Sequence, residues 1–193
     1  SLPLEENTTY TFVVDGVKDT SGEAFAYFSS TFTTGTSGNG GPITDLDQVS
    51  FTNAGSVAGG YYTSLTFGPD GLFYALSVSG DIDRFRVAAD GTLSDKETLS
   101  SWKTAYGDRT SIGFVFDPAA TADNLIAYIS HDSGGLNNAP DWDGKISRLT
   151  GATLQNEELL VTNLPRSLRD HLTNSLAFNP AEPNALYFNQ GSN

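Results

Sequence analysis

The chain has 193 residues and a formal net charge of −13, and it contains no cysteine and no methionine. The absence of cysteine excludes a disulfide framework, a thiol nucleophile and cysteine-ligated zinc. An acidic surface repels phosphate backbones, so we expect no nucleic-acid partner, and no apolar run is long enough to predict a membrane span. The many Gly, Thr, Ser and Asn residues favour an all-β fold of short strands joined by tight turns.

Residues 1–35 are predicted to be the C-terminal part of a truncated Ig-like β-sandwich. The segments 8–14 (TTYTFVV) and 28–34 (FSSTFTT) alternate as strands do, and Gly16 and Gly22 mark turns between them. Two strands cannot form an independent core, so we expect further strands before them. The words NTTYT, VKDTSG and STFTTG resemble the end of a bacterial surface-layer Ig-like module, which implies an extracellular, cell-surface or periplasmic protein of bacteria.

A Gly- and Ser-rich linker is predicted at 36–45. Its first part, TSGNGGP, offers no side chain for a core, and such a composition is typical of a flexible connection between domains. We therefore expect a second domain over 46–193.

A repeated pattern in this second domain predicts a β-propeller. Three copies of a strand, a turn and a second strand begin with SLTFGP, SIGFVFDP and SLAFNP, which align Pro69, Pro118 and Pro180. The segments 80–99 and 144–160 supply a third and a fourth strand after the first two copies. Recurring four-stranded units indicate the N-terminal blades of a propeller, about two and a half of them, with a sandwich or a solenoid as the alternative.

Propeller geometry places the loop that enters the first strand of each blade at the same end as the loop that leaves the second strand. Polar residues in these loops are Tyr61, Tyr62, Arg109, His131, Asp132, Arg166, Arg169, Asp170, His171 and Gln190. His171 is the best candidate for a general base, because a neutral imidazole accepts a proton from a hydroxyl. Asp170 would orient the ring or hold the loop backbone. The alternative for both histidines is a structural role with loop carbonyls as partners.

The segment 137–144 (NNAPDWDG) is rich in oxygen ligands. Asp141 and Asp143 precede Gly144 in a pattern that is similar to part of a calcium loop, although the full twelve-residue spacing is missing. The alternative is a turn built on Asx side chains. Asp81 and Asp83, which flank Ile82, are expected on the exposed face of a strand.

The third copy is similar to a known enzyme family. Residues 169–178 (RDHLTNSLAF), 185–188 (ALYF) and 190–193 (QGSN) resemble the soluble glucose/sorbosone dehydrogenase family, although Asn174-Ser175 stands where that family often has Gly-Arg. The resemblance implies a six-bladed propeller that binds pyrroloquinoline quinone (PQQ) with calcium. It implies that His171, next to Asp170, takes the proton of a sugar hydroxyl, and that the side chains around the quinone are those of Arg169, Gln190 and Asn193.

Two functions follow as predictions. The first is a secreted PQQ-dependent sugar (aldose) dehydrogenase, an oxidoreductase, of which this chain is a part. The second is a non-catalytic extracellular propeller that acts as an adhesin or a carbohydrate-binding module. Both predict a sugar or a polysaccharide as partner, and both expect the remaining blades in the same or a companion chain, because an open propeller presents an unpaired sheet edge.

Overall fold

The computed structural model describes residues 4, 5, 7–18, 22, 24, 27–34, 53, 55–57, 59–135, 139–166 and 171–191. The chain divides into two compact units, Ser1–Thr52 and Asn53–Asn193. The described residues form antiparallel β-sheets and one 3-10 turn, η2 (Ser101–Lys103), so the all-β prediction is confirmed. They include no helix long and apolar enough to cross a membrane. The predicted linker at 36–45 lies outside these residues.

In the first unit the described strands, β1 (Thr9–Val14) and β2 (Phe28–Thr33), form an antiparallel hairpin. Cross-strand aromatic pairs hold it, with the rings of Tyr10 and Phe32 stacked at 5.7 Å between centroids. Every side chain of both strands is at least partly exposed, so these strands form no core by themselves. The two predicted strands are confirmed, whereas their assignment to an Ig-like sandwich stays a prediction.

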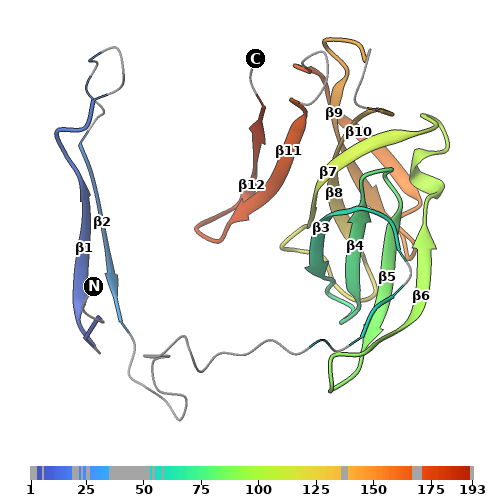
Figure 1. Cartoon of the computed structure of the whole chain (residues 1–193), viewed down its shortest axis with the longest axis horizontal. Helices are drawn as coiled ribbons and strands as arrows, with labels where there is room; N and C mark the ends of the chain where they lie inside the picture. Colours follow the sequence, from blue (N-terminus) through green and yellow to red (C-terminus); the bar gives the residue numbers. More distant parts are fainter. Residues whose placement is uncertain are drawn as a thin grey trace. The chain divides into compact units, whose positions relative to one another are not determined.

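The described residues of the second unit form three antiparallel sheets, each made of strands that are consecutive in the chain (Figure 1). The first sheet has β3 (Tyr62–Phe67), β4 (Phe73–Ser77), β5 (Ile82–Val87) and β6 (Leu93–Leu99). The second sheet has β7 (Arg109–Phe116), β8 (Ile126–Ser133), β9 (Gly144–Thr150) and β10 (Asn156–Leu164). The third sheet is the hairpin of β11 (Thr173–Asn179) and β12 (Glu182–Gln190). The three repeated sequence patterns thus begin three separate sheets.

The turn between the first two strands of each sheet follows one design. A side-chain oxygen accepts a hydrogen bond from the backbone N–H two residues later: Leu72 donates to Asp70, Ala119 to Asp117 and Ala181 to Asn179. The hydroxyl of a tyrosine on the second strand donates to an acid of the same turn, from Tyr74 to Asp70, Tyr128 to Asp117 and Tyr187 to Glu182. The repeat therefore extends from the sequence to the hydrogen bonds that close each turn.

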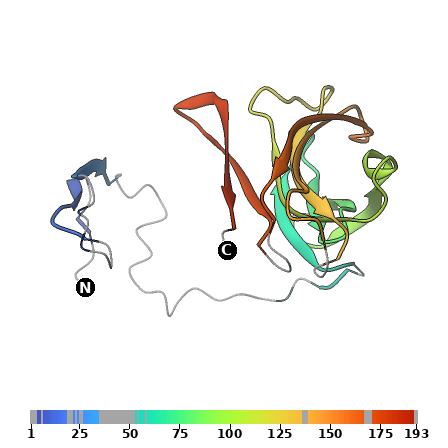
Figure 2. The same ribbon diagram turned by 90° about the horizontal axis from the view of Figure 1, so that it is seen from above.

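The main core lies between the first and second sheets. The ring of Tyr74 packs against Phe114 and Phe116, with centroids 6.2 and 4.9 Å apart. The other buried apolar members of this core are Leu76, Ile82, Leu99, Trp102, Leu125, Ala127, Ile129, Leu149 and Leu154. The edge strand β7 contacts both β3 and β11, so the first strands of the three sheets are neighbours. Figure 2 shows how the sheets diverge from these neighbouring strands.

Candidate functional site

His171 lies two residues before β11, and its side chain is exposed. The residue that follows β12 is Gly191, whose backbone N–H donates to the carbonyl of Leu172 at 3.1 Å. A Cβ on Gly191 would come within 2.9 Å of the Cα and Cβ atoms of His171, so only glycine fits this approach without a shift. The entry to β11 and the exit from β12 therefore meet beside the candidate base.

The other predicted residues around His171 are placed only in part. Gln190 accepts a hydrogen bond from the Thr173 hydroxyl at 2.9 Å and donates to the carbonyl of Pro165 at 2.8 Å, so its amide joins β11 to the preceding segment. Arg169, Asp170 and Asn193 lie outside the described residues. Of the three residues predicted around the quinone, Gln190 is thus the one that is described, and its side-chain amide is already hydrogen-bonded to protein atoms.

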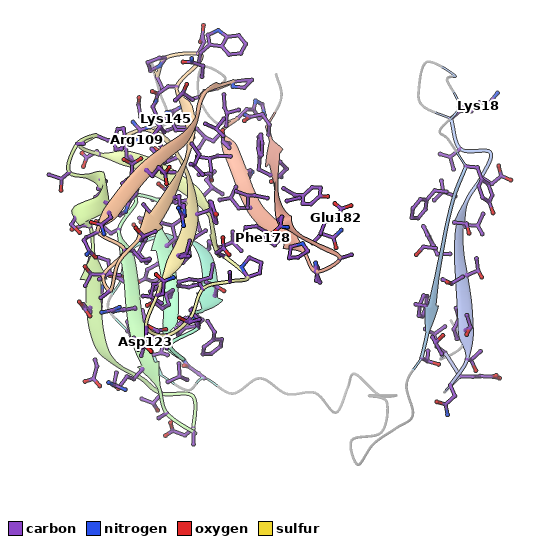
Figure 3. The ribbon with its side chains drawn as sticks, turned by 180° about the vertical axis from the view of Figure 1, so that it is seen from behind. Lys18, Arg109, Asp123, Lys145, Phe178 and Glu182 are labelled. Atoms are coloured by element: carbon purple, nitrogen blue, oxygen red, sulfur yellow. The ribbon has the colours of Figure 1, made fainter. Side chains whose placement is uncertain are left out.

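The entry to β11 lies at the same end of the unit as the start of β7. A Cβ on Gly144, the first residue of β9, would come within 2.7 Å of the hydroxyl oxygen of Thr173. The backbone carbonyl of Asn174 accepts a hydrogen bond from Ser130 of β8 at 2.8 Å. Figure 3 shows Arg109 and Lys145 at this end of the second sheet and Asp123 at the opposite end. The two histidines are therefore brought to one end of the unit.

His131 is not a loop residue, because it lies within β8 and is completely buried, so its predicted position is wrong. The Nε of Arg109 donates to its Nδ1 at 3.0 Å. Because a guanidinium group only donates, Nδ1 must be the acceptor and the ring is neutral with its proton on Nε2. Burial and then the charge of Arg109 lower the pKa of His131 to about 3. Its position is unsuited to taking a proton from a substrate.

A directional chain of hydrogen bonds starts at this histidine. Its Nε2–H donates to the hydroxyl of Ser147 at 2.8 Å, and that hydroxyl donates to a carboxylate oxygen of Glu157 at 2.5 Å. The hydroxyl of Tyr106 donates to the same oxygen at 2.9 Å. No pattern in the sequence indicated Ser147, Glu157 or Tyr106, because these residues lie on different elements and meet only when the second sheet has formed.

The carboxylate of Asp143, a predicted calcium ligand, already accepts hydrogen bonds from donors of the protein. The backbone N–H and the hydroxyl of Ser133 both donate to it, and the ammonium of Lys145 lies 2.6 Å away. Burial alone would raise the pKa of Asp143, but these hydrogen bonds outweigh it and lower the pKa to about 2. Asp141 has an exposed side chain and accepts the backbone N–H of Arg166 at 2.6 Å through its carbonyl. Calcium stays a prediction, since no group of three potential ligand side chains converges among the described residues.

Asp132 follows His131, points to the opposite face of β8 and is buried. Its carboxylate oxygens find no hydrogen-bond donor within the described part of the chain. Burial raises the pKa of Asp132 to about 6, and the charges of Arg166 and Arg109 offset this only in part. Arg166 is itself buried and donates to the backbone carbonyls of Ser133 and Gly135. This arginine thus fixes the end of β8, and Asp132 stays close to it without a hydrogen bond.

The expectation that Asp83 lies on an exposed face is wrong, because its side chain is buried on the outer face of the first sheet. The hydroxyls of Tyr62 and Thr98 donate to it, each at 2.6 Å, and the ammonium of Lys96 lies 2.8 Å away. These donors outweigh the effect of burial and hold the pKa of Asp83 below its usual value. Alternation indicates which residues share a face, but it does not tell whether that face is covered.

Compared with known proteins, the chain matches no family model, no curated protein and no solved structure. The resemblance to sugar dehydrogenases in residues 169–193 therefore stays a prediction from the sequence.

Proposed function

We propose that the second unit is part of a β-propeller of the sugar dehydrogenase type. Three features support this proposal. The three sheets are formed by consecutive antiparallel strands, their first strands β3, β7 and β11 are neighbours, and each sheet packs on the next. A two-layer sandwich would leave no place for a third sheet on the far side of the second. Loops from successive sheets would then gather at one end of a central channel.

The proposed activity is oxidation of a sugar hydroxyl with His171 as general base. One observation carries this proposal: His171 is exposed at the end where the candidate loops gather, whereas His131 is buried and neutral. The imidazole would take the hydroxyl proton as the carbinol carbon loses a hydride. PQQ, when bound, supplies the two-electron acceptor for that hydride. His171 and the sequence resemblance fit this chemistry, and the engaged amide of Gln190 argues for a supporting role of that residue in the loop.

The test uses the intact protein with PQQ, calcium and an aldose, and follows dye reduction. Replacing His171 by Ala should lower kcat by about two to four orders of magnitude, the usual reach of a general base. Quinone binding, followed by absorbance titration, should be little changed in His171→Ala, because the imidazole acts on the sugar. Absence of quinone binding to the intact protein would overturn the proposal.

A second candidate, a non-catalytic carbohydrate-binding propeller, is favoured by exposed aromatic residues at this same end. Tyr61, directly before β3, is 87% exposed, and Trp142, two residues before β9, is 64% exposed. Flat aromatic side chains that remain in water at a loop-rich end are typical of a binding surface. Quenching or enhancement of Trp142 fluorescence by oligosaccharides, in protein that binds no quinone, would favour this function over the first.

A further inference from the structure

The sequence contains one complete acceptor pattern for an N-linked glycan. Asn7 is followed by Thr8 and Thr9, and no other Asn in the sequence has Ser or Thr two positions later. In exported proteins the pattern Asn-x-Ser or Asn-x-Thr, with x other than Pro, accepts a glycan on the Asn side-chain amide where it lies on the surface. Whether Asn7 can serve as an acceptor depends on how the first unit presents it.

Asn7 is presented to solvent in a turn two residues before β1. Its side chain is exposed, and its φ of 48° is in the left-handed region, which Asn adopts more readily than most residues with a Cβ. Its side-chain amide has no hydrogen-bond partner among the described residues. The amide nitrogen is thus open to a reagent that approaches from solvent.

The backbone on both sides of this turn is fixed to Thr34, the residue that follows β2. The N–H of Thr34 donates to the carbonyl of Thr8 at 3.0 Å, and the N–H of Thr8 donates to the Thr34 hydroxyl at 2.9 Å. On the other side of the turn, that hydroxyl donates to the carbonyl of Glu5 at 2.5 Å. These contacts hold Glu5 and Thr8 against the hairpin and leave Asn7 as the exposed part of the turn.

The register of the hairpin separates the acceptor pattern from the apolar face of the unit. One face carries Thr9, Thr11, Thr31 and Thr33, and the other carries Tyr10, Phe12, Phe28 and Phe32. A further layer would pack on the aromatic face, because burial of apolar area is favourable and burial of unpaired hydroxyls is not. The hydroxyl of Thr9, which completes the pattern, is exposed on the threonine face and lies 2.8 Å from the hydroxyl of Thr33.

We propose that Asn7 is the attachment site of an N-linked glycan in the exported protein. The donor is a lipid-linked oligosaccharide pyrophosphate, and the catalyst is an oligosaccharyltransferase. The amide nitrogen of Asn7 forms a bond to C1 of the first sugar while the bond from C1 to the pyrophosphate oxygen breaks. The amide loses one proton and the lipid pyrophosphate leaves, so nothing is oxidised or reduced. The inference requires export of the chain but not the dehydrogenase activity.

The test uses the full chain behind a cleavable export signal, in cells that contain the transferase and its lipid-linked donor. Trypsin releases residues 1–18 as one peptide, because Lys18 is the first basic residue of the chain. Mass spectrometry should find the glycan on this peptide, and an amidase that removes the glycan should convert the side chain of Asn7 to that of Asp. The substitutions Asn7→Gln and Thr9→Ala should each abolish the modification, whereas Thr9→Ser should keep it.

Two controls make each outcome decisive. Thr8→Ala removes the neighbouring hydroxyl but leaves the pattern intact, so its peptide should still carry the glycan. Gly41→Thr completes a second pattern that begins at Asn39 in the Gly- and Ser-rich linker. The cells are chosen as ones that glycosylate Asn39 of this variant, so the transferase is known to act on the exported chain. An unmodified Asn7 in that same chain, or a glycan that persists on residues 1–18 of Asn7→Gln, would overturn the proposal.

Discussion

The first and second sheets both bury a polar residue at the same place on their third strand, but they satisfy it in different ways. Asp83 of β5 pairs with Ala75, and Ser147 of β9 pairs with Ile129 at the equivalent position. Asp83 is an acceptor that collects three donors. Ser147 both accepts and donates within the chain from His131 to Glu157. The repeat therefore determines where a polar group is buried, while local partners determine its chemistry.

The apolar part of the same repeat shows no such variation. Tyr74 meets Phe116, and Tyr128 meets Phe178, with similar ring contacts. Apolar packing needs only matching shape, so one residue pattern works at each interface. A buried polar group needs every donor and acceptor to be matched, so each network is specific to its sheet. Functional differences between the sheets should therefore reside in the polar positions.

Replacing Asp83 by Ala should cause the largest loss of stability, about 3 kcal/mol, because the hydroxyls of Tyr62 and Thr98 and the ammonium of the partly exposed Lys96 lose their shared acceptor. The chain has two tryptophans, Trp102 and Trp142, both in the second unit, so their fluorescence follows its unfolding in denaturant. Since the folded pKa of Asp83 lies below its usual value of 3.8, this stabilisation is present above that pH and is lost as the pH falls further.

Asp81 provides the matched control for this substitution. It also flanks Ile82 but is only partly buried, with Lys103 2.9 Å away. Asp81→Ala should cost about 1 kcal/mol or less, as for a surface ion pair. Equal losses for the two aspartates would contradict the distinction between the partly buried carboxylate of Asp81 and the buried one of Asp83.

Asp132→Asn should instead stabilise the folded protein, by about 2–3 kcal/mol at pH 8. The folded pKa is about 6 against a usual 3.8, so the folded protein keeps a proton between these values that the unfolded chain releases. The stabilisation from this proton is present at pH 4 and is lost as the pH rises through 6. An Asn never ionises, so the variant should unfold at a higher temperature at pH 8 and lose this advantage toward pH 4.

The opposite case is Asp143→Asn, because hydrogen bonds lower the pKa of Asp143 to about 2. This substitution should destabilise the protein at pH 8, where Lys145 and Ser133 lose a charged acceptor. Thermal unfolding at pH 4, 6 and 8 compares both variants with the unchanged chain. A destabilised Asp132→Asn at pH 8 would show that the neighbouring arginines require the charge.

Much of this fold could be predicted from the sequence. The alternating segments and aligned prolines located the first two strands of each sheet in the second unit, because short-range pattern and turn chemistry determine them. The site was harder to predict. β7 and β8 are packed on both faces, so alternation could not tell that His131 would be enclosed by Trp102 and Tyr106. Its partners come from other strands and depend on the register between them.

The smallest effects should come from removing one hydroxyl in each polar network. The difference between the two losses of stability distinguishes the network around Asp83 from the one that runs from His131 to Glu157. Tyr62→Phe leaves Asp83 with Thr98 and Lys96, so it should cost about 1 kcal/mol, the usual net value of a hydrogen bond. Ser147→Ala leaves the Nε2–H of His131 buried without its acceptor, so it should cost about 2 kcal/mol. Denaturant unfolding of both variants measures this. Equal small losses would mean that water replaces the missing hydroxyl of Ser147, and the chain from His131 to Glu157 would then not depend on direct contact.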